Sequence, residues 1–196
     1  MENKKLCSIC RGQCCKHGGG ELSPSDFKEG VTYETIKARI ERGLISIDWW
    51  EGNVFEDIED SPYRSENINK CLFLRMRHKG ASVVDPSFGG ECVALTEKGC
   101  SLPYDERPKV CRELIPDIEI KEDHLKLNCH SDWDKKDSAI EWFEYREILH
   151  RLLIEYFNPS DIPIIRCMAD ILGINLAEYN NDDPFFNKLI THFLEM

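Results

Sequence analysis

The spacing of apolar residues changes several times along the chain, and each change predicts a different element. Residues 32–42 place Ile36 and Ile40 four positions apart and are followed by Gly43, which predicts an amphipathic helix that ends at the glycine. Just before it, the sequence Ser-Pro-Ser-Asp at 23–26 has the form of a capping box with proline at the first helical position. The early part of the chain is therefore expected to form short helices.

Strand-like patterns follow in the middle of the chain, where apolar and polar residues alternate or strand-forming side chains cluster. They predict a small antiparallel sheet and, further along, a hairpin that turns at Glu122 and Asp123. The segments of the sheet are 44–50, 71–77 and 81–84, and those of the hairpin are 117–120 and 125–127.

Two connections in this region differ in character. Residues 52–69 are acidic and rich in turn-forming residues, with a brief strand pairing expected at Val54 and Phe55. Residues 86–116 are dominated by glycine, proline, cysteine and charge. This composition predicts an irregular segment that is held by bonds other than a continuous strand ladder.

The last third of the chain returns to a helical spacing of apolar residues. Asp137 is placed to cap a long helix that runs through Phe157. A further helix is expected at about 160–172, and a short terminal one begins at Asp183.

Together these elements predict a single α+β domain over 1–196. Its centre is expected to be a small, irregular, cysteine-rich and metal-bound core over 7–129, with short antiparallel strands. Several α-helices pack with this core and lie mainly in the C-terminal part, 137–196. The length and the hydrophobic share of 41% suit one globular domain with its own core.

The charge of the chain narrows the classes of partner. Its formal net charge is −11, which disfavours nucleic acid and anionic membrane surfaces because binding to phosphate requires clustered lysine and arginine. No apolar run is long enough to span a bilayer, and the first residues lack the apolar centre of a secretory signal. We therefore expect a soluble, cytoplasmic protein.

The ten cysteines are the main candidates for chemistry, because thiols in a reducing cytosol bind metal or react more often than they form disulfides. A secreted disulfide scaffold is the alternative, and the missing signal disfavours it. Cys71 and Cys167 lie in apolar stretches and are assigned to the core. The other eight lie among glycines, turn-forming residues or charges and are the candidate metal ligands: Cys7, Cys10, Cys14, Cys15, Cys92, Cys100, Cys111 and Cys129.

Eight thiolates suit two tetrahedral four-cysteine sites, with the adjacent Cys14 and Cys15 serving different ions because both on one ion would be strained. One iron-sulfur cubane held by four cysteines suits the same inventory, and both interpretations stay open. His17 and His130 each neighbour a candidate cysteine and are reserve ligands. The remaining histidines have no ligand-like spacing and are expected on the surface or on helix faces: His78, His124, His150 and His192.

Two blocks of the sequence carry a family resemblance. Residues 7–15 read Cys-Ser-Ile-Cys-Arg-Gly-Gln-Cys-Cys, and residues 92–112 contain a cysteine, then Gly-Cys, Arg-Pro and Cys-Arg in that order. In both blocks the chain resembles the cysteine-cluster proteins of the CxxCxxCC type, which have a zinc- or iron-chelating domain. The chain departs from the family pattern by one extra residue between Cys10 and Cys14 and by an inserted Pro103.

This resemblance covers roughly residues 7–116 and implies metal binding through seven of the candidate cysteines. Cys129 is added from its local context alone. Flagellin lysine methylases are similar in their cysteine blocks, but the chain has no glycine-rich nucleotide loop that would hold a methyl donor.

Two functions remain open at this point. The first is a protein that binds zinc, iron or an iron-sulfur cluster at a structural site, joining the N-terminal loop to the central segment and presenting a surface to a protein or peptide partner. The second is an enzyme, either an iron-sulfur redox protein or one that modifies a peptide or protein. In that case Cys14 or Cys15, near Arg11 and Lys16, would be partly open to substrate.

Overall fold

The computed structural model describes residues 12–16, 18–86, 90–97, 99–121, 124–130 and 135–156. For Gln13, Cys14 and the strands within 115–130 the description covers the backbone. The two helices expected after residue 159 lie outside the described residues, as does Cys167.

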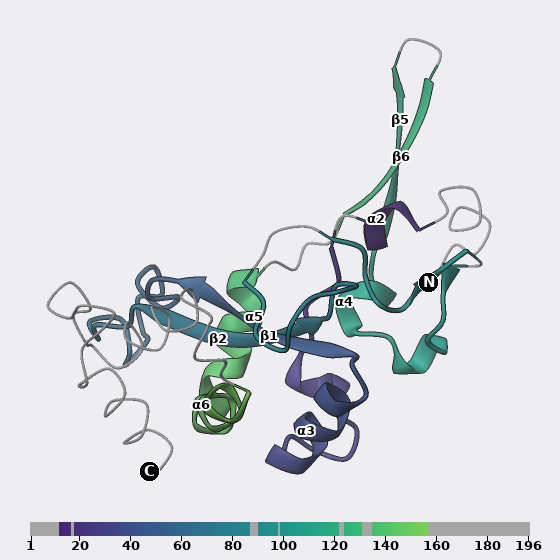
Figure 1. Cartoon of the computed structure of the whole chain (residues 1–196). Coiled ribbons are helices and arrows are strands. Elements are labelled where there is room, and N and C mark those ends of the chain that lie inside the picture. The colour runs from purple at the N-terminus through teal and green to yellow at the C-terminus, as the bar shows by residue number, and fades with distance from the viewer. Residues whose placement is uncertain are drawn as a thin grey trace, which may run out of the picture.

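The centre of the fold is the antiparallel pair formed by β1 (Ile45–Glu51) and β2 (Lys70–Met76). Their register runs from Ile45 opposite Met76 to Glu51 opposite Lys70, which confirms the two expected strands. Six of the seven residues of β2 are buried, so both faces of this strand are covered. Figure 1 shows α5 and α6 on one side of the pair and α3 near its other end.

The segment 18–22 lies along the free edge of β2 and extends the sheet. Met76 N–H donates to the Gly20 carbonyl at 2.9 Å, and Leu22 N–H donates to the Leu74 carbonyl at 2.8 Å. The Leu22 carbonyl in turn accepts from Ser138 Oγ at 3.0 Å and from Trp142 Nε1 at 2.7 Å, both on α5. The polypeptide that follows the first cysteine block is therefore fixed to the core.

Both predicted helix starts near the N-terminus are confirmed. Ser23 caps the 3-10 helix η1 (Pro24–Asp26) in a complete capping box. Thr32 caps α3 (Tyr33–Glu41), and Gly43 follows it with φ +73°, a conformation that glycine adopts without strain. Ile36 and Ile40 are both buried, as their spacing predicts.

The long helix expected from Asp137 is instead broken into α5 (Lys135–Trp142), η3 (Phe143–Tyr145) and α6 (Arg146–Glu155). Asp137 lies within the first turn of α5 and does not cap it. The break falls in a run of aromatic residues: Phe143 packs edge-on against Phe55 with ring centres 4.8 Å apart. Phe143 is thus anchored in the core at the point where the α-helix gives way to the 3-10 turn η3.

Two smaller expectations are wrong. Residues 81–84 do not form a strand of the antiparallel sheet, since only Val84 pairs, in a parallel bridge with Ile47. The chain then turns inward, because Asp85 reaches the buried Arg75. Val54 and Phe55 lie in a turn and are buried there, so they fill the core and form no strand pairing.

The cysteine-rich segment from 90 onward has little continuous regular structure. It consists of the two-residue strands β3 (Leu95–Thr96) and β4 (Gly99–Cys100), the 3-10 helix η2 (Tyr104–Glu106) and one turn of helix, α4 (Lys109–Arg112). This matches the irregular segment that its composition predicts.

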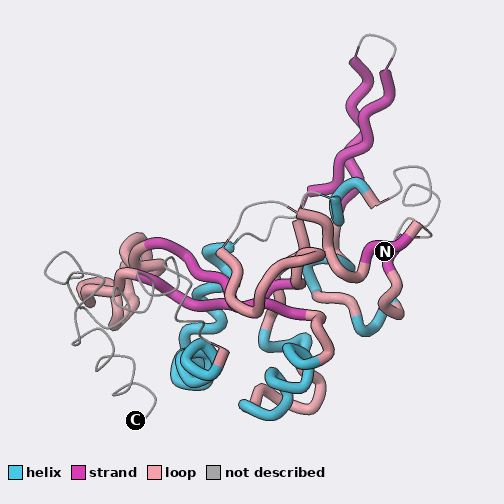
Figure 2. The backbone as a smooth tube through the Cα atoms, viewed as in Figure 1, coloured by secondary structure: helices cyan, strands magenta, loops and turns pink. Residues whose placement is uncertain are grey.

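The expected hairpin is confirmed and is longer than predicted. It pairs β5 (Ile115–Lys121) with β6 (His124–His130) in antiparallel register. Figures 1 and 2 show it projecting from the rest of the molecule, with the short helix α2 (Gln13–Lys16) at its base. Among the described residues, no helix is long and apolar enough to cross a membrane.

Candidate metal centre

The two cysteine blocks meet at Cys15 and Cys92. The backbone N–H of Cys92 donates to the carbonyl of Cys15 at 2.8 Å, although 76 residues lie between them along the chain. Cys92 is buried and Cys15 is half-buried against the core. Cys14 precedes Cys15 on α2, so the motif that carries both lies beside the second block.

Cys111 approaches the same N-terminal segment from α4. A Cβ atom placed on Gly20 would lie 2.5 Å from the Cys111 sulfur, so the thiol rests directly against the glycine. Cys111 lies between Lys109 and Arg112 on this helix, and the Arg112 guanidinium pairs with Asp26 Oδ1 at 3.3 Å.

Cys100 and Cys129 lie on the two hairpins that flank α2. Cys100 on β4 pairs with Leu95 on β3, and a Cβ atom on Gly12 would lie 2.5 Å from Leu95 Cδ1. Cys129 lies on β6 opposite Pro116, and β6 runs beside α2. Four candidate cysteines thus belong to segments that border α2 and the 18–20 stretch after it, and Cys15 lies on α2 itself; the four are Cys92, Cys100, Cys111 and Cys129.

The donor set fits a thiophilic ion, because cysteine sulfur is the ligand that structural zinc and iron-sulfur clusters use. Among the side chains that the structure describes, no three His, Cys, Asp or Glu residues lie close enough to hold an ion together. Cys7 and Cys10 lie outside the described residues, as does His17, while Cys14, Cys129 and His130 are described by their backbone. Assignment of ligands to a particular ion therefore stays a prediction.

A comparison with family models identifies the family to which the two cysteine blocks belong. The model of the CxxCxxCC family, described as "Putative zinc- or iron-chelating domain", matches residues 6–131. The chain belongs to the CxxCxxCC family. The match confirms the resemblance carried by the two cysteine blocks and names zinc or iron as the metal, and it extends past Cys129. No curated protein and no solved structure matches this chain.

Cys71 is a residue of the hydrophobic core. It lies on β2 with 2% of its surface exposed, and its thiol faces the Gly52 carbonyl, 3.8 Å from the sulfur. Burial raises the pKa of the Cys71 thiol and so opposes formation of the thiolate. Its predicted place in the core is confirmed.

His78 is the residue that sequence reasoning placed wrongly. It is 3% exposed, and its backbone pairs with Cys92 in an antiparallel bridge. Its Nε2 accepts from Gly19 N–H at 3.2 Å and lies 2.6 Å from Arg75 Nη1, while its Nδ1 lies 3.5 Å from Asp85 Oδ2. Burial lowers the pKa of His78, and the charge of Arg75 lowers it further.

The buried Arg75 links His78 to the sheet and to the helical layer. Its Nη2 donates to Asp85 Oδ2 at 2.8 Å, and its Nε lies 3.0 Å from Asp48 Oδ2. Lys135 on α5 pairs with the same Asp48 oxygen at 3.0 Å. Nearby, burial raises the pKa of the Glu21 carboxyl. Charged groups this deep are stable only when paired, so the network fixes the strands beneath the CxxCxxCC cluster.

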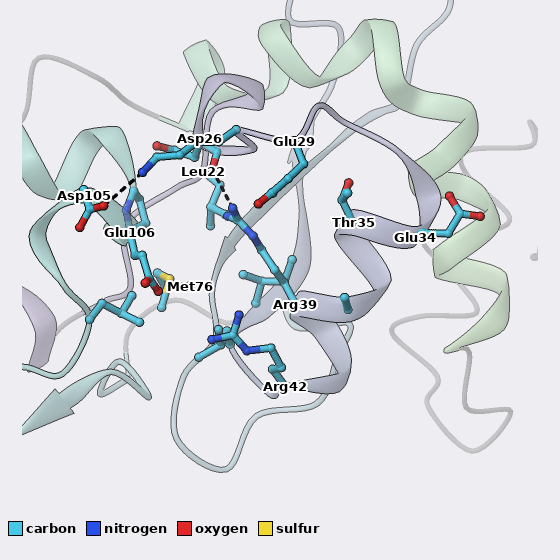
Figure 3. A pocket seen from close by; sticks show the side chains of 16 residues that line it. Leu22, Asp26, Glu29, Glu34, Thr35, Arg39, Arg42, Met76, Asp105 and Glu106 are labelled. Carbon is cyan, nitrogen blue, oxygen red and sulfur yellow. Dashed lines mark hydrogen bonds and ion pairs between the residues drawn. The ribbon is translucent and has the colours of Figure 1, made fainter.

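An open groove of about 640 Å³ lies beside the second cysteine block. Its floor includes Leu22, Ile45 and Met76, and the 102–108 segment between Cys100 and Cys111 forms one wall. Figure 3 shows Arg39 reaching from α3 toward Asp26, whose carbonyl accepts from Arg39 Nη2 at 2.7 Å. The rim carries both signs of charge: Asp26, Lys28, Glu29, Glu34, Arg39, Arg42, Asp105 and Glu106.

Proposed function

We propose that this CxxCxxCC protein uses its metal as a structural cross-link, and that the cross-link shapes a surface for a protein or peptide partner. The observation that carries the proposal is the hydrogen bond between Cys15 and Cys92, which brings the two cysteine blocks side by side. Cysteines from both blocks can bind the same metal site when their backbones approach within reach of the two side chains, and this contact brings them well within that reach. A metal bond there would close a long loop of the chain.

The irregular backbone of the second block supports a structural role. Among the described residues of 90–112, the strand pairs amount to two residues in each of β3 and β4, which is far less than a stable sheet needs. Metal–thiolate bonds supply folding free energy in small domains of this kind. We infer that they do so here.

The groove supports the partner part of the proposal. Leu102 and Pro108 in its wall belong to the segment between Cys100 and Cys111, so a metal that orders this segment also shapes the groove. An apolar floor below a rim of mixed charge suits a peptide with an apolar side chain flanked by charged ones. Nothing in the charge of the groove favours nucleic acid.

Elemental analysis with an ultraviolet-visible spectrum of anaerobically purified protein tests the metal. For two four-cysteine sites we expect roughly two zinc ions per chain and no visible band. Iron together with a broad band near ~400 nm would identify a cluster and would support the redox alternative.

Removal of the metal by a chelator tests the structural role. We expect the metal-free chain to lose native circular dichroism and to melt at a lower temperature, and hydrogen exchange in the 102–108 wall to accelerate. Restoring the metal should reverse these changes. A metal-free protein with unchanged circular dichroism and melting temperature would contradict the structural role. Unchanged hydrogen exchange in 102–108 would show that the metal does not order the wall of the groove.

A further inference from the structure

His78 lies where the two cysteine-bearing segments cross. Gly19, four residues after Cys15, donates its N–H to His78 Nε2 at 3.2 Å. On the other side, a Cβ atom on Gly90 would lie 2.9 Å from the imidazole ring, and Gly90 has φ +129°. Each cysteine segment thus passes the ring at a glycine, where the backbone can come closest.

The backbone of His78 also holds the second block directly. It bridges to Cys92, and on either side Lys79 N–H donates to the Glu91 carbonyl at 2.7 Å and Val93 N–H to the Arg77 carbonyl at 2.9 Å. One residue therefore contacts the second block through its backbone at Cys92 and, through its ring, the segment that directly follows the first block.

The hydrogen-bond partners define the state of the ring. Gly19 N–H donates to Nε2, so this nitrogen carries the lone pair. Arg75 Nη1 lies 2.6 Å from Nε2 and 3.1 Å from Nδ1, so it does not by itself choose between the two nitrogens. The proton then sits on Nδ1, which faces the Asp85 carboxylate at 3.5 Å. Because Gly19 N–H occupies the Nε2 lone pair, the ring is oriented by the protein and not by a metal.

We propose that His78 is the positioning residue of the metal centre: its ring sets the separation between the Cys14–Cys15 segment and Cys92 before the metal binds. Arg75 and Asp85 hold the ring in place. This inference rests on the proposed metal-binding function. Groups that orient ligands without touching the metal typically change metal affinity by about 10–100-fold when they are removed.

A matched pair of amide variants tests the proposal. In His78→Gln the side-chain carbonyl can take the place of Nε2 and accept from Gly19, whereas in His78→Asn it is too short. Competition titration with Zn²⁺ and with Co²⁺ should show affinity near wild type for His78→Gln and at least about tenfold weaker for His78→Asn. The Co²⁺–thiolate absorption bands should shift in His78→Asn alone.

A variant that weakens the core elsewhere separates positioning from stability. Ile36→Val removes a methyl group from α3, where the side chain is fully buried, and should leave metal affinity and the Co²⁺ spectrum unchanged. The proposal is overturned if His78→Asn binds metal like the wild type with the same spectrum, or if Ile36→Val weakens binding equally.

A measurement on the unmodified chain covers the case in which His78→Asn does not fold. Long-range proton–nitrogen NMR of the wild-type protein should show a protonated Nδ1 and an unprotonated Nε2 at His78, both with and without metal. A proton on Nε2, or a metal bonded to either nitrogen, would overturn the proposal. A wild-type chain that bound none of zinc, iron or cobalt would remove the proposed function itself and this inference with it.

Discussion

Gly20 lets the candidate ligand Cys111 pack directly against the N-terminal segment, because glycine has no side chain. The Cys111 sulfur and the Val110 side chain both lie within 2.6 Å of the point where a Cβ atom on Gly20 would stand. No side chain fits there unless α4 moves away from the N-terminal segment. Gly18, two residues earlier, has nothing within 4 Å of the corresponding point.

These two glycines form a matched pair for mutation. Gly20→Ala should displace Cys111, lower the free energy of unfolding of the metal-loaded protein by about 1–3 kcal/mol and weaken metal binding, because overpacking forces the helix to shift. Gly18→Ala should leave both quantities close to wild type. Denaturant unfolding and metal titration of the two variants check this. Equal unfolding free energies and metal affinities in both variants would show that the contact of Gly20 with Cys111 contributes to neither.

At the residue scale, the sequence predicts the burial of Cys71 but not that of His78. Cys71 could be assigned to the core because its neighbours are apolar, and burial follows the local pattern. His78 could not, because its partners Gly19 and Asp85 are set by the fold. One signal was available: Arg75 interrupts an apolar strand, and a charged residue in such a place needs a buried partner.

At the element scale, local rules succeed and tertiary packing overrides the rest. The starts of η1 and α3 follow from capping boxes that involve residues three apart. The break between α5 and α6 does not, because it depends on contacts of Phe143 with the distant Phe55 and Tyr63. Helical periodicity alone carries no information about such contacts.

The helix α6 also carries a pH-sensitive group. Burial lowers the pKa of His150, and the positive charge of Arg146 lowers it further, while Glu147 opposes the shift. The unfolded chain therefore binds this proton first as the pH falls below about 6.5. The contribution of His150 to stability is present above that pH and is lost as the pH falls toward the folded-state pKa.

The variant His150→Gln should remove this dependence. Between pH 7.5 and 5.5 the wild-type chain should lose more stability than the variant, by at most about 1.4 kcal/mol per pH unit, which corresponds to one proton. Denaturant unfolding of both metal-loaded chains over this range measures the difference, and any release of metal by acid affects both alike. Parallel loss of stability in the two chains would show that His150 does not titrate differently on unfolding.

At the scale of the whole molecule, the sequence predicts the family and the candidate ligands, and the fold shows which segments meet. Two spaced cysteine blocks suffice to identify a CxxCxxCC protein. Their spacing does not reveal that Cys15 lies beside Cys92 or that Cys111 lies against Gly20, because both contacts arise from the way β2 aligns the 18–22 segment. The segments that carry the candidate ligands thus meet at one edge of the sheet-and-helix core.

Cysteine alkylation mapped by mass spectrometry tests the central claim most directly. In the metal-loaded protein the eight candidate ligands should resist alkylation, and a chelator should expose cysteines of both blocks together, while the reactivity of the core residue Cys71 should not depend on the metal until the chain unfolds. The account predicts metal-dependent protection at Cys15, Cys92 and Cys111 in the same titration. Equal labelling of these three with and without metal would contradict it.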